Sequence, residues 1–108
     1  MAVSNEQLAQ RQNLFRDANE RIEYAATVVG HKGTRPFICE CSLDGCLERI
    51  EVETEVYEAV RGHAAQFFTL PGHEIAEIED VVARREGYQV VEKQDRFAEI
   101  ALSGNPRR

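Results

Sequence analysis

The 108-residue chain lacks the features that mark several classes of protein. No apolar run approaches the ~20 residues needed to cross a bilayer, so we expect no membrane-spanning helix. Residues 1–6 have neither the basic start nor the apolar stretch of a secretory signal, which favours a cytoplasmic location. The chain has no Gly-rich phosphate loop, no nucleophile elbow and no His-Glu-x-x-His motif. We therefore expect a protein without catalytic residues.

Basic residues are too few and too scattered for a protein that binds nucleic acid. The net charge is −6; residues 36–70 carry seven acidic side chains against two basic ones, and residues 71–94 carry six against three. Binding to phosphate backbones needs a basic stripe, and an anionic membrane surface makes a similar demand. We therefore expect neither nucleic acid nor a membrane as a partner, and we consider proteins or small ligands instead.

Cysteine is scarce but concentrated, because all three cysteines lie within eight positions as Cys39-x-Cys41-x4-Cys46. On an extended segment, residues two apart project to the same face, so Cys39 and Cys41 can present both sulfurs to one point. The Asp44-Gly45 pair predicts a tight turn that brings Cys46 back toward that point. Three thiolates and one nitrogen form the tetrahedral site that zinc prefers, and we predict a zinc knuckle with one zinc ion per chain. Buried or redox-active thiols are the alternative; the odd number of cysteines argues against a closed disulfide framework.

Three histidines compete for the fourth ligand position. We favour His73, because it follows Pro71-Gly72, a turn that can hold an imidazole at a fixed angle after a strand. His31 lies in a Gly-rich connector, and His63 lies at a predicted helix end, where a cation complements the helix dipole without any metal. A carboxylate such as Asp44 or a water molecule is the other choice.

With water as the fourth ligand, the metal site would be open to a substrate, and Glu74 could act as a general base. Three thiolates donate much negative charge to the metal, however, which makes it a poor Lewis acid. We therefore expect a structural zinc ion held by Cys39, Cys41, Cys46 and His73.

The apolar pattern predicts an α+β fold, in which a long N-terminal helix precedes a small zinc-centred domain with a short antiparallel sheet and two helices. Strands are predicted at residues 36–41, 47–52, 67–70 and 88–93. Helices are predicted at residues 55–61 and 74–86. The second helix is favoured over half of a hairpin because its apolar residues step by three and four and Gly87 can cap it. The predicted units are residues 1–30, 36–93 and a partly disordered tail, 94–108, with one weak apolar turn.

The N-terminal helix is predicted for residues 4–29, with a Ser4–Gln7 capping box at its start and Gly30 at its end. Its apolar residues recur at helical spacing: Leu8, Phe15, Ala18, Ile22, Ala25 and Val29, with Leu14 and Val28 beside them. This stripe either packs on the zinc domain or binds a second copy or another protein.

The chain resembles a family of small, largely uncharacterised bacterial proteins common in actinobacteria. The resemblance covers most of residues 10–93 and lies in these segments: Asn19-Glu20-Arg21-Ile22, Phe37-Ile38-Cys39-Glu40-Cys41 with Cys46, Tyr57-Glu58-Ala59-Val60-Arg61, Pro71-Gly72-His73-Glu74 and Gly87-Tyr88-Gln89-Val90-Val91-Glu92-Lys93. It implies a shared metal site of three cysteines and one histidine.

The CDGSH-type 2Fe–2S proteins also bind metal through three cysteines and one histidine, and they share a Cys-x-Cys start. This chain departs from their pattern, since Cys46 comes too soon and His73 lies twenty-seven positions after it. We therefore do not expect an iron–sulfur cluster.

These observations together predict a small structural-zinc protein that acts as a non-catalytic adaptor or regulator in protein–protein interaction. A protein partner or self-association through the N-terminal helix would fit this role. The alternative is a thiol redox or metal sensor that uses the cysteine cluster; a zinc-module nucleic-acid binder or a zinc enzyme fits the sequence less well.

Overall fold

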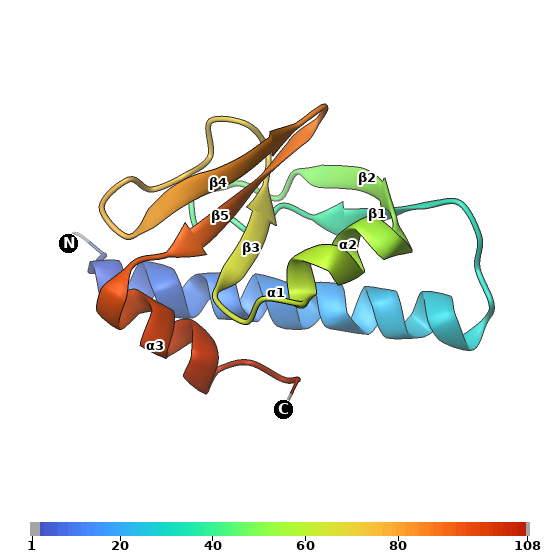
Figure 1. The fold of residues 1–108 in the computed structure, drawn as a ribbon, viewed down its shortest axis with the longest axis horizontal. Coiled ribbons are helices and arrows are strands. Elements are labelled where there is room, and N and C mark those ends of the chain that lie inside the picture. Colours follow the sequence, from blue (N-terminus) through green and yellow to red (C-terminus); the bar gives the residue numbers. More distant parts are fainter. Residues whose placement is uncertain (1–2, 108) are drawn as a thin grey trace.

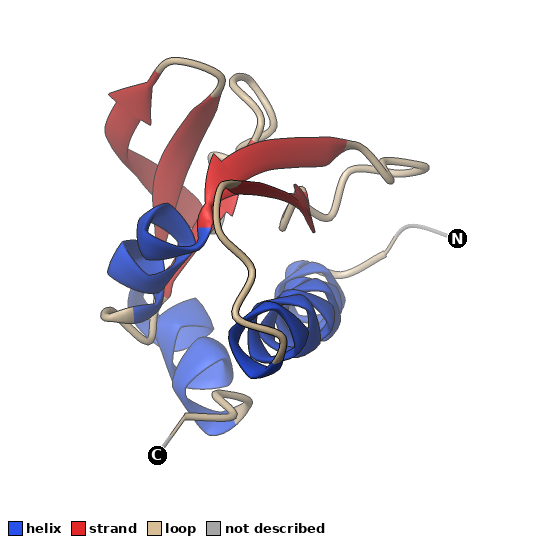
Figure 2. Cartoon of the chain, turned by 90° about the vertical axis from the view of Figure 1, so that its right-hand side faces the viewer, coloured by secondary structure: helices blue, strands red, loops and turns tan. Residues whose placement is uncertain are grey.

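A computed structural model describes residues 3–107 of the chain. The helices lie on one side of the molecule and the strands on the other, with the long first helix running beneath the strands (Figures 1 and 2). The elements in chain order are α1 (Asn5–Val28), β1 (Thr34–Ile38), β2 (Arg49–Glu53), α2 (Thr54–Arg61), β3 (Gln66–Thr69), β4 (Glu79–Arg85), β5 (Tyr88–Lys93) and α3 (Asp95–Ser103). This arrangement confirms the predicted α+β class.

The strands form two antiparallel sheets. β1 pairs with β2, so that Phe37 lies opposite Ile50. The other sheet has the order β3-β5-β4, with β5 in the centre. The four predicted strands are therefore present, and β4 is an additional strand. Their ends lie within about two residues of the predicted ends, except that β1 already ends at Ile38 and not at residue 41.

α1 begins as the sequence predicts. The Ser4 hydroxyl accepts a hydrogen bond from the Gln7 backbone N–H at 3.1 Å, and the Gln7 side chain accepts one from the Ser4 N–H at 2.9 Å. After the last turn, Gly30 has a φ of +67°, a left-handed conformation that suits glycine at a helix end. Both end signals are confirmed.

The face of α1 that packs on the strands is polar at its centre, which the apolar pattern did not predict. Gln12, Arg16 and Asn19 are fully buried, and their spacings of four and three place them on one face of the helix. Leu8 and Ile22 of the predicted stripe are half-buried at the margins of the core.

The helix predicted at residues 74–86 is wrong: residues 79–85 are strand β4, which forms a hairpin with β5. Val81 and Val82 are β-branched residues that favour a strand, and Val81 pairs with Val91. Gly87 has a φ of +86° in the turn between Arg85 and Tyr88, so this glycine forms a hairpin turn and not a helix cap.

A helix, α3, occupies most of the segment in which the sequence predicted one apolar turn and a tail. Phe97 and Ala101 are buried, the first beside Ala9 of α1 and the second beside Phe67 of β3. This tertiary contact stabilises a helix whose own apolar pattern is short. Residue 108, at the end of the predicted disordered tail, lies outside the described residues, and the domain boundaries stay a prediction.

The largest cluster of buried side chains lies between the two sheets and α2. Its centre is aromatic: the Phe37 and Tyr57 rings stack with centroids 4.6 Å apart, and Phe68 meets both edge-on. Cys39 and Cys41 belong to the same cluster, so the cysteine segment is anchored in the core. Among the described residues, no helix is both long and apolar enough to cross a membrane.

Candidate metal centre

The first two cysteines lie on an extended segment that continues from β1. The Cys39 N–H donates to the Glu48 carbonyl at 2.9 Å, and the Glu40 N–H donates to the Phe68 carbonyl at 2.9 Å. Because side chains alternate along such a segment, Cys39 and Cys41 face one side while Glu40 faces the other. The Glu40 carboxylate is accordingly buried against α1 and β3.

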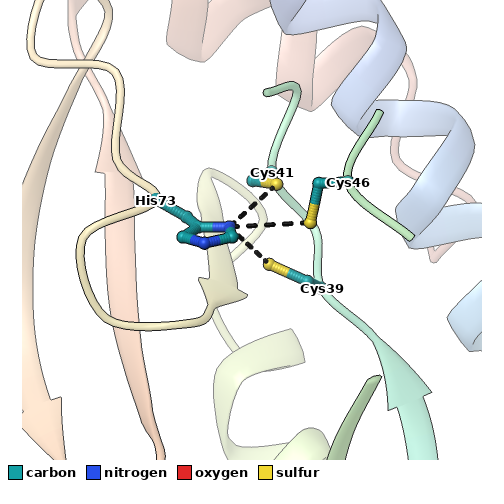
Figure 3. Close-up of side chains that lie close together, drawn as sticks. All are labelled: Cys39, Cys41, Cys46 and His73. Carbon is teal, nitrogen blue, oxygen red and sulfur yellow. Dashed lines mark hydrogen bonds between the residues drawn. The ribbon is translucent and has the colours of Figure 1, made fainter. Parts of the chain in front are cut away.

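A tight turn brings the third cysteine back to the other two. The Cys46 N–H donates to the Leu43 carbonyl at 3.1 Å, and Gly45, with a φ of +75°, provides the left-handed residue of the turn. The predicted Asp44-Gly45 turn is therefore present, and Cys46 lies beside Cys39 and Cys41 (Figure 3).

His73 reaches the cysteines from the loop that follows β3. Gly72 has a φ of +83°, and the His73 N–H donates to the Leu70 carbonyl at 3.1 Å, which closes a turn around Pro71-Gly72. The imidazole ring points toward the three sulfurs, with Nδ1 in front of them (Figure 3).

The four ligand atoms have the spacing of a single tetrahedral metal site. His73 Nδ1 lies 3.7 Å from Cys39 Sγ, 3.5 Å from Cys41 Sγ and 3.6 Å from Cys46 Sγ, and all four atoms lie within 4.8 Å of one another. Zinc bonds of about 2.3 Å to sulfur and about 2.0 Å to nitrogen, at tetrahedral angles, place the nitrogen about 3.5 Å from each sulfur. One ring nitrogen cannot form a hydrogen bond with three sulfurs at once. The set, hereafter the Cys3His cluster, could therefore hold one metal ion.

The thiols of the Cys3His cluster differ in their ease of ionisation. A hydrogen bond with Cys39 lowers the pKa of Cys41 to about 5, and a contact with His73 acts in the same direction. The same hydrogen bond, together with burial, raises the pKa of Cys39, and burial raises that of Cys46. Coordination of a metal by all three sulfurs requires all three thiols to be deprotonated, so metal binding would release protons.

Backbone amides also support the sulfurs. The Leu70 N–H donates to Cys39 Sγ at 3.2 Å. The backbone N–H of Leu43 helps to lower the pKa of Cys41, and that of Glu48 opposes the rise that burial causes in the pKa of Cys46. Such donors stabilise thiolate charge next to a metal.

The other candidate ligands lie outside the cluster. His31 is exposed, and its Nε2 lies 3.0 Å from the Thr34 carbonyl oxygen. His63 and Asp44 are also exposed. Glu74, considered above as a general base, accepts a hydrogen bond from Gln89 at 2.7 Å, and this bond lowers its pKa.

Sequence reasoning missed two buried polar residues on the side of the cysteine segment opposite the sulfurs: Asn19 of α1, and Glu40, which belongs to the segment itself. Asn19 of α1 and Glu40 are both fully buried and hydrogen-bonded to each other at 2.9 Å. Burial raises the pKa of Glu40 to about 7, while its bonds to Asn19 and to the Phe68 amide act against this shift. The alternation of side chains that places the two cysteines on one face also places Glu40 on the opposite face, in the core. This alternation is the sequence signal that could have predicted the burial of Glu40.

Comparisons of the chain with protein-family models, with curated proteins and with solved structures find no match. The resemblance to the actinobacterial family stays a prediction. Any assignment of function must therefore come from the chain's own geometry, in which the β1–β2 and β3–β4 connections bring together a Cys3His cluster able to hold one metal ion.

Proposed function

We propose that this chain is a structural-zinc protein, in which Cys39, Cys41, Cys46 and His73 bind one zinc ion. The observation that carries the proposal is the near-equal distance, 3.5–3.7 Å, from His73 Nδ1 to the three sulfurs. Three thiolates and one imidazole are a common zinc ligand set, and four protein ligands leave no position open for water or substrate. A reduced compartment such as the cytoplasm would keep the thiols available.

The short distances within the cluster favour a single ion over a two-iron cluster. In a 2Fe–2S centre, two ligands bind each iron, so ligands on opposite irons lie farther apart than ligands on one ion. All four ligand atoms here lie within 4.8 Å of one another.

Zinc at this position would link the two sheets. The cysteines lie in the connection between β1 and β2, whereas His73 lies in the connection between β3 and β4. For a domain of this size, a metal that joins two parts of the chain contributes directly to folding free energy. Its role would be to hold the strands and α1 in a fixed arrangement.

For the biological role, we propose a non-catalytic adaptor or regulator that binds another protein, or a second copy, through the outer face of α1. Leu14, Tyr24 and Val28 on this helix are 68%, 70% and 65% exposed. Their spacings place them on one face, opposite the buried residues Gln12 and Asn19. Large apolar side chains grouped on an exposed helix face are typical of an interaction surface.

The metal proposal is tested by elemental analysis of freshly purified protein, with a visible spectrum. His73→Ala and His63→Ala form a matched pair, because His63 is an exposed histidine outside the cluster. We expect one zinc per chain and no colour in the wild type and in His63→Ala, and a weakened site in His73→Ala. Iron with visible absorption, or protein without metal, would refute the proposal.

The interaction proposal is tested by co-purification and by the mass of the particle in solution. Tyr24→Glu on α1 should abolish a stoichiometric complex, while Val82→Glu, which changes an exposed valine on β4, should leave it intact. A complex that survives Tyr24→Glu would rule out this face of α1 as the binding surface.

A thiol redox or metal sensor is the second candidate, favoured by the half-buried position of Cys46 at the edge of the cluster. Two thiolates would lose two electrons to hydrogen peroxide, which is reduced to water, and the resulting disulfide would release the metal. Mild peroxide should then eject zinc and change partner binding; zinc that stays bound would exclude this role.

A further inference from the structure

We propose that Asn19 and Glu40 are positioning residues of the metal centre, which hold Cys39 and Cys41 in place from the side opposite the metal. This inference rests on the proposed zinc site and extends it into α1. Neither residue belongs to the Cys3His cluster, and both are fully buried.

Asn19 binds the backbone next to the first cysteine with both ends of its side-chain amide. Its Oδ1 accepts the Ile38 N–H at 2.7 Å, and its Nδ2 donates to the Ile38 carbonyl at 2.8 Å. The same Nδ2 donates to Glu40 Oε2 at 2.9 Å. The side chain thus pairs with Ile38 as a neighbouring strand would, and it fixes the residues on both sides of Cys39.

Glu40 lies between the two cysteines. Its backbone N–H, its backbone carbonyl and both oxygens of its carboxylate all form hydrogen bonds. Its Oε1 accepts the Phe68 N–H at 3.1 Å, and its own N–H donates to the Phe68 carbonyl at 2.9 Å. Its carbonyl accepts a bond from Gln12 Nε2 at 3.2 Å. The segment is therefore bound to α1 on one side and to β3 on the other.

The bond to Phe68 connects the two parts of the chain that supply the proposed metal ligands: the cysteine arm, residues 39–46, and the histidine arm, residues 70–73. β3 leads from Phe68 through Leu70, whose N–H donates to Cys39 Sγ, into the turn that holds His73. Glu40 thus sets the position of the cysteine arm relative to the histidine arm. An apolar residue at position 40 could fill the same volume, but it could not accept hydrogen bonds from both β3 and α1.

The site that these residues support is preorganised. With the backbone held on both sides, the sulfurs of Cys39 and Cys41 face His73 without needing the metal to arrange them. Groups that orient metal ligands in this way typically change metal affinity by about 10- to 100-fold when they are mutated. The expected effect of losing Asn19 or Glu40 is therefore on zinc retention, beyond any effect on stability.

The test compares Asn19→Ala with Asn13→Ala in the full-length, zinc-loaded protein. Asn13 is an asparagine on the same helix whose Nδ2 bonds the Ile100 carbonyl of α3 at 3.1 Å, away from the metal site. The measurements are the rate of zinc transfer to a chromophoric chelator, the zinc affinity by chelator competition, the spectrum of the cobalt-substituted protein and the melting temperature.

We expect Asn19→Ala to weaken zinc binding and to speed its transfer by about tenfold or more, and to alter the cobalt spectrum. Asn13→Ala should lower the melting temperature while leaving zinc affinity and the cobalt spectrum unchanged. Zinc affinity within about twofold of wild type in Asn19→Ala, or an equal loss in both variants, would overturn the inference.

Glu40→Gln keeps the test decisive should Asn19→Ala fail to fold. A glutamine offers only one acceptor oxygen, so either the Asn19 Nδ2 or the Phe68 N–H loses its hydrogen bond to the side chain at position 40, while the size of that side chain is kept. Faster zinc transfer in this variant supports the inference, and an unchanged rate refutes it. A wild-type protein that binds no zinc would refute the proposed function itself. Zinc affinity and transfer rate that are unchanged in both Asn19→Ala and Glu40→Gln would refute only the positioning role.

Discussion

Arg107 binds Glu58 of α2 with both terminal nitrogens of its guanidinium group, at 2.9 and 2.7 Å. Its Nε also donates to Glu20 of α1 at 2.9 and 3.0 Å. Two helices and the C-terminal segment are therefore joined at one cation. The hydrogen bonds from Arg107 lower the pKa of Glu58. The pKa of Glu23 is raised, mainly by burial and also by its interaction with Glu58.

The ion pair between Arg107 and Glu58 predicts a pH-dependent contribution to the stability of the fold. A carboxylate whose folded-state pKa lies below its unfolded value stabilises the fold above the unfolded pKa of about 4.3, and the contribution is lost as the pH falls through the folded pKa. We expect Arg107→Met to lower the melting temperature at pH 7 and to have a smaller effect at about pH 3. The raised pKa of Glu23 has the opposite sign in the wild type, but Arg107 acts to lower that pKa, so the substitution adds to the loss of stability at pH 7.

Thermal unfolding followed from pH 7 to pH 3 checks this prediction. Arg96→Met is the matched control, since Arg96 forms an exposed ion pair with Glu6 at 2.9 Å, and such pairs contribute at most about 1 kcal/mol. A decrease in melting temperature that is the same at both pH values would contradict the assignment.

Removal of the metal should destabilise the protein, because the proposed zinc joins the two sheets. A ligand present at about 1,000 times its Kd stabilises a fold by about 4 kcal/mol. We expect a strong chelator to lower the melting temperature of the wild type, and added zinc to restore it. Cys46→Ser should melt at the lower temperature with or without chelator; a wild type that is insensitive to chelator would argue against a structural metal.

The aromatic cluster behind the cysteines should contribute strongly to stability. Phe37 is fully buried, stacks on Tyr57 and contacts Phe68 edge-on. Replacing a buried phenylalanine by alanine typically costs about 3–5 kcal/mol, because apolar contacts are lost and a cavity is left. Phe37→Ala should show this loss in denaturant unfolding, whereas Leu47→Ala, at an exposed leucine, should change stability by less than about 0.5 kcal/mol.

The hairpin between β4 and β5 can be tested at its turn. Gly87 has a φ of +86°, a conformation in which a Cβ costs about 1–2 kcal/mol. Gly87→Ala should therefore destabilise the protein by about this amount in denaturant unfolding. Gly62→Ala is the control, because Gly62 ends α2 with a φ of −63°. Equal effects of the two substitutions would speak against the hairpin turn.

Local signals in the sequence determined much of the fold and of the candidate site. Ser4 and Gln7 predicted the start of α1 because a capping box involves only residues three apart. The spacing of Cys39, Cys41 and Cys46 around Gly45 predicted their convergence for the same reason: alternation and turn geometry act over a few residues.

The remainder depended on strand pairing and tertiary packing that the local apolar pattern did not specify. Residues 79–85 pair with β5 as a strand although their apolar spacing also suits a helix, because β5 offers a partner edge and Gly87 closes the turn. α3 forms because Phe97 is buried against α1. A periodic pattern alone cannot distinguish these outcomes.

The candidate site shows the same division. The sequence alone placed three sulfurs together and named His73 as the favoured partner, because Pro71-Gly72 predicted a turn at that point. Only the tertiary structure decided that Asn19 and Glu40, which are 21 residues apart in the chain, meet behind the cysteines. A buried polar group requires a partner, but its position in the sequence does not say which distant residue will supply the hydrogen bond.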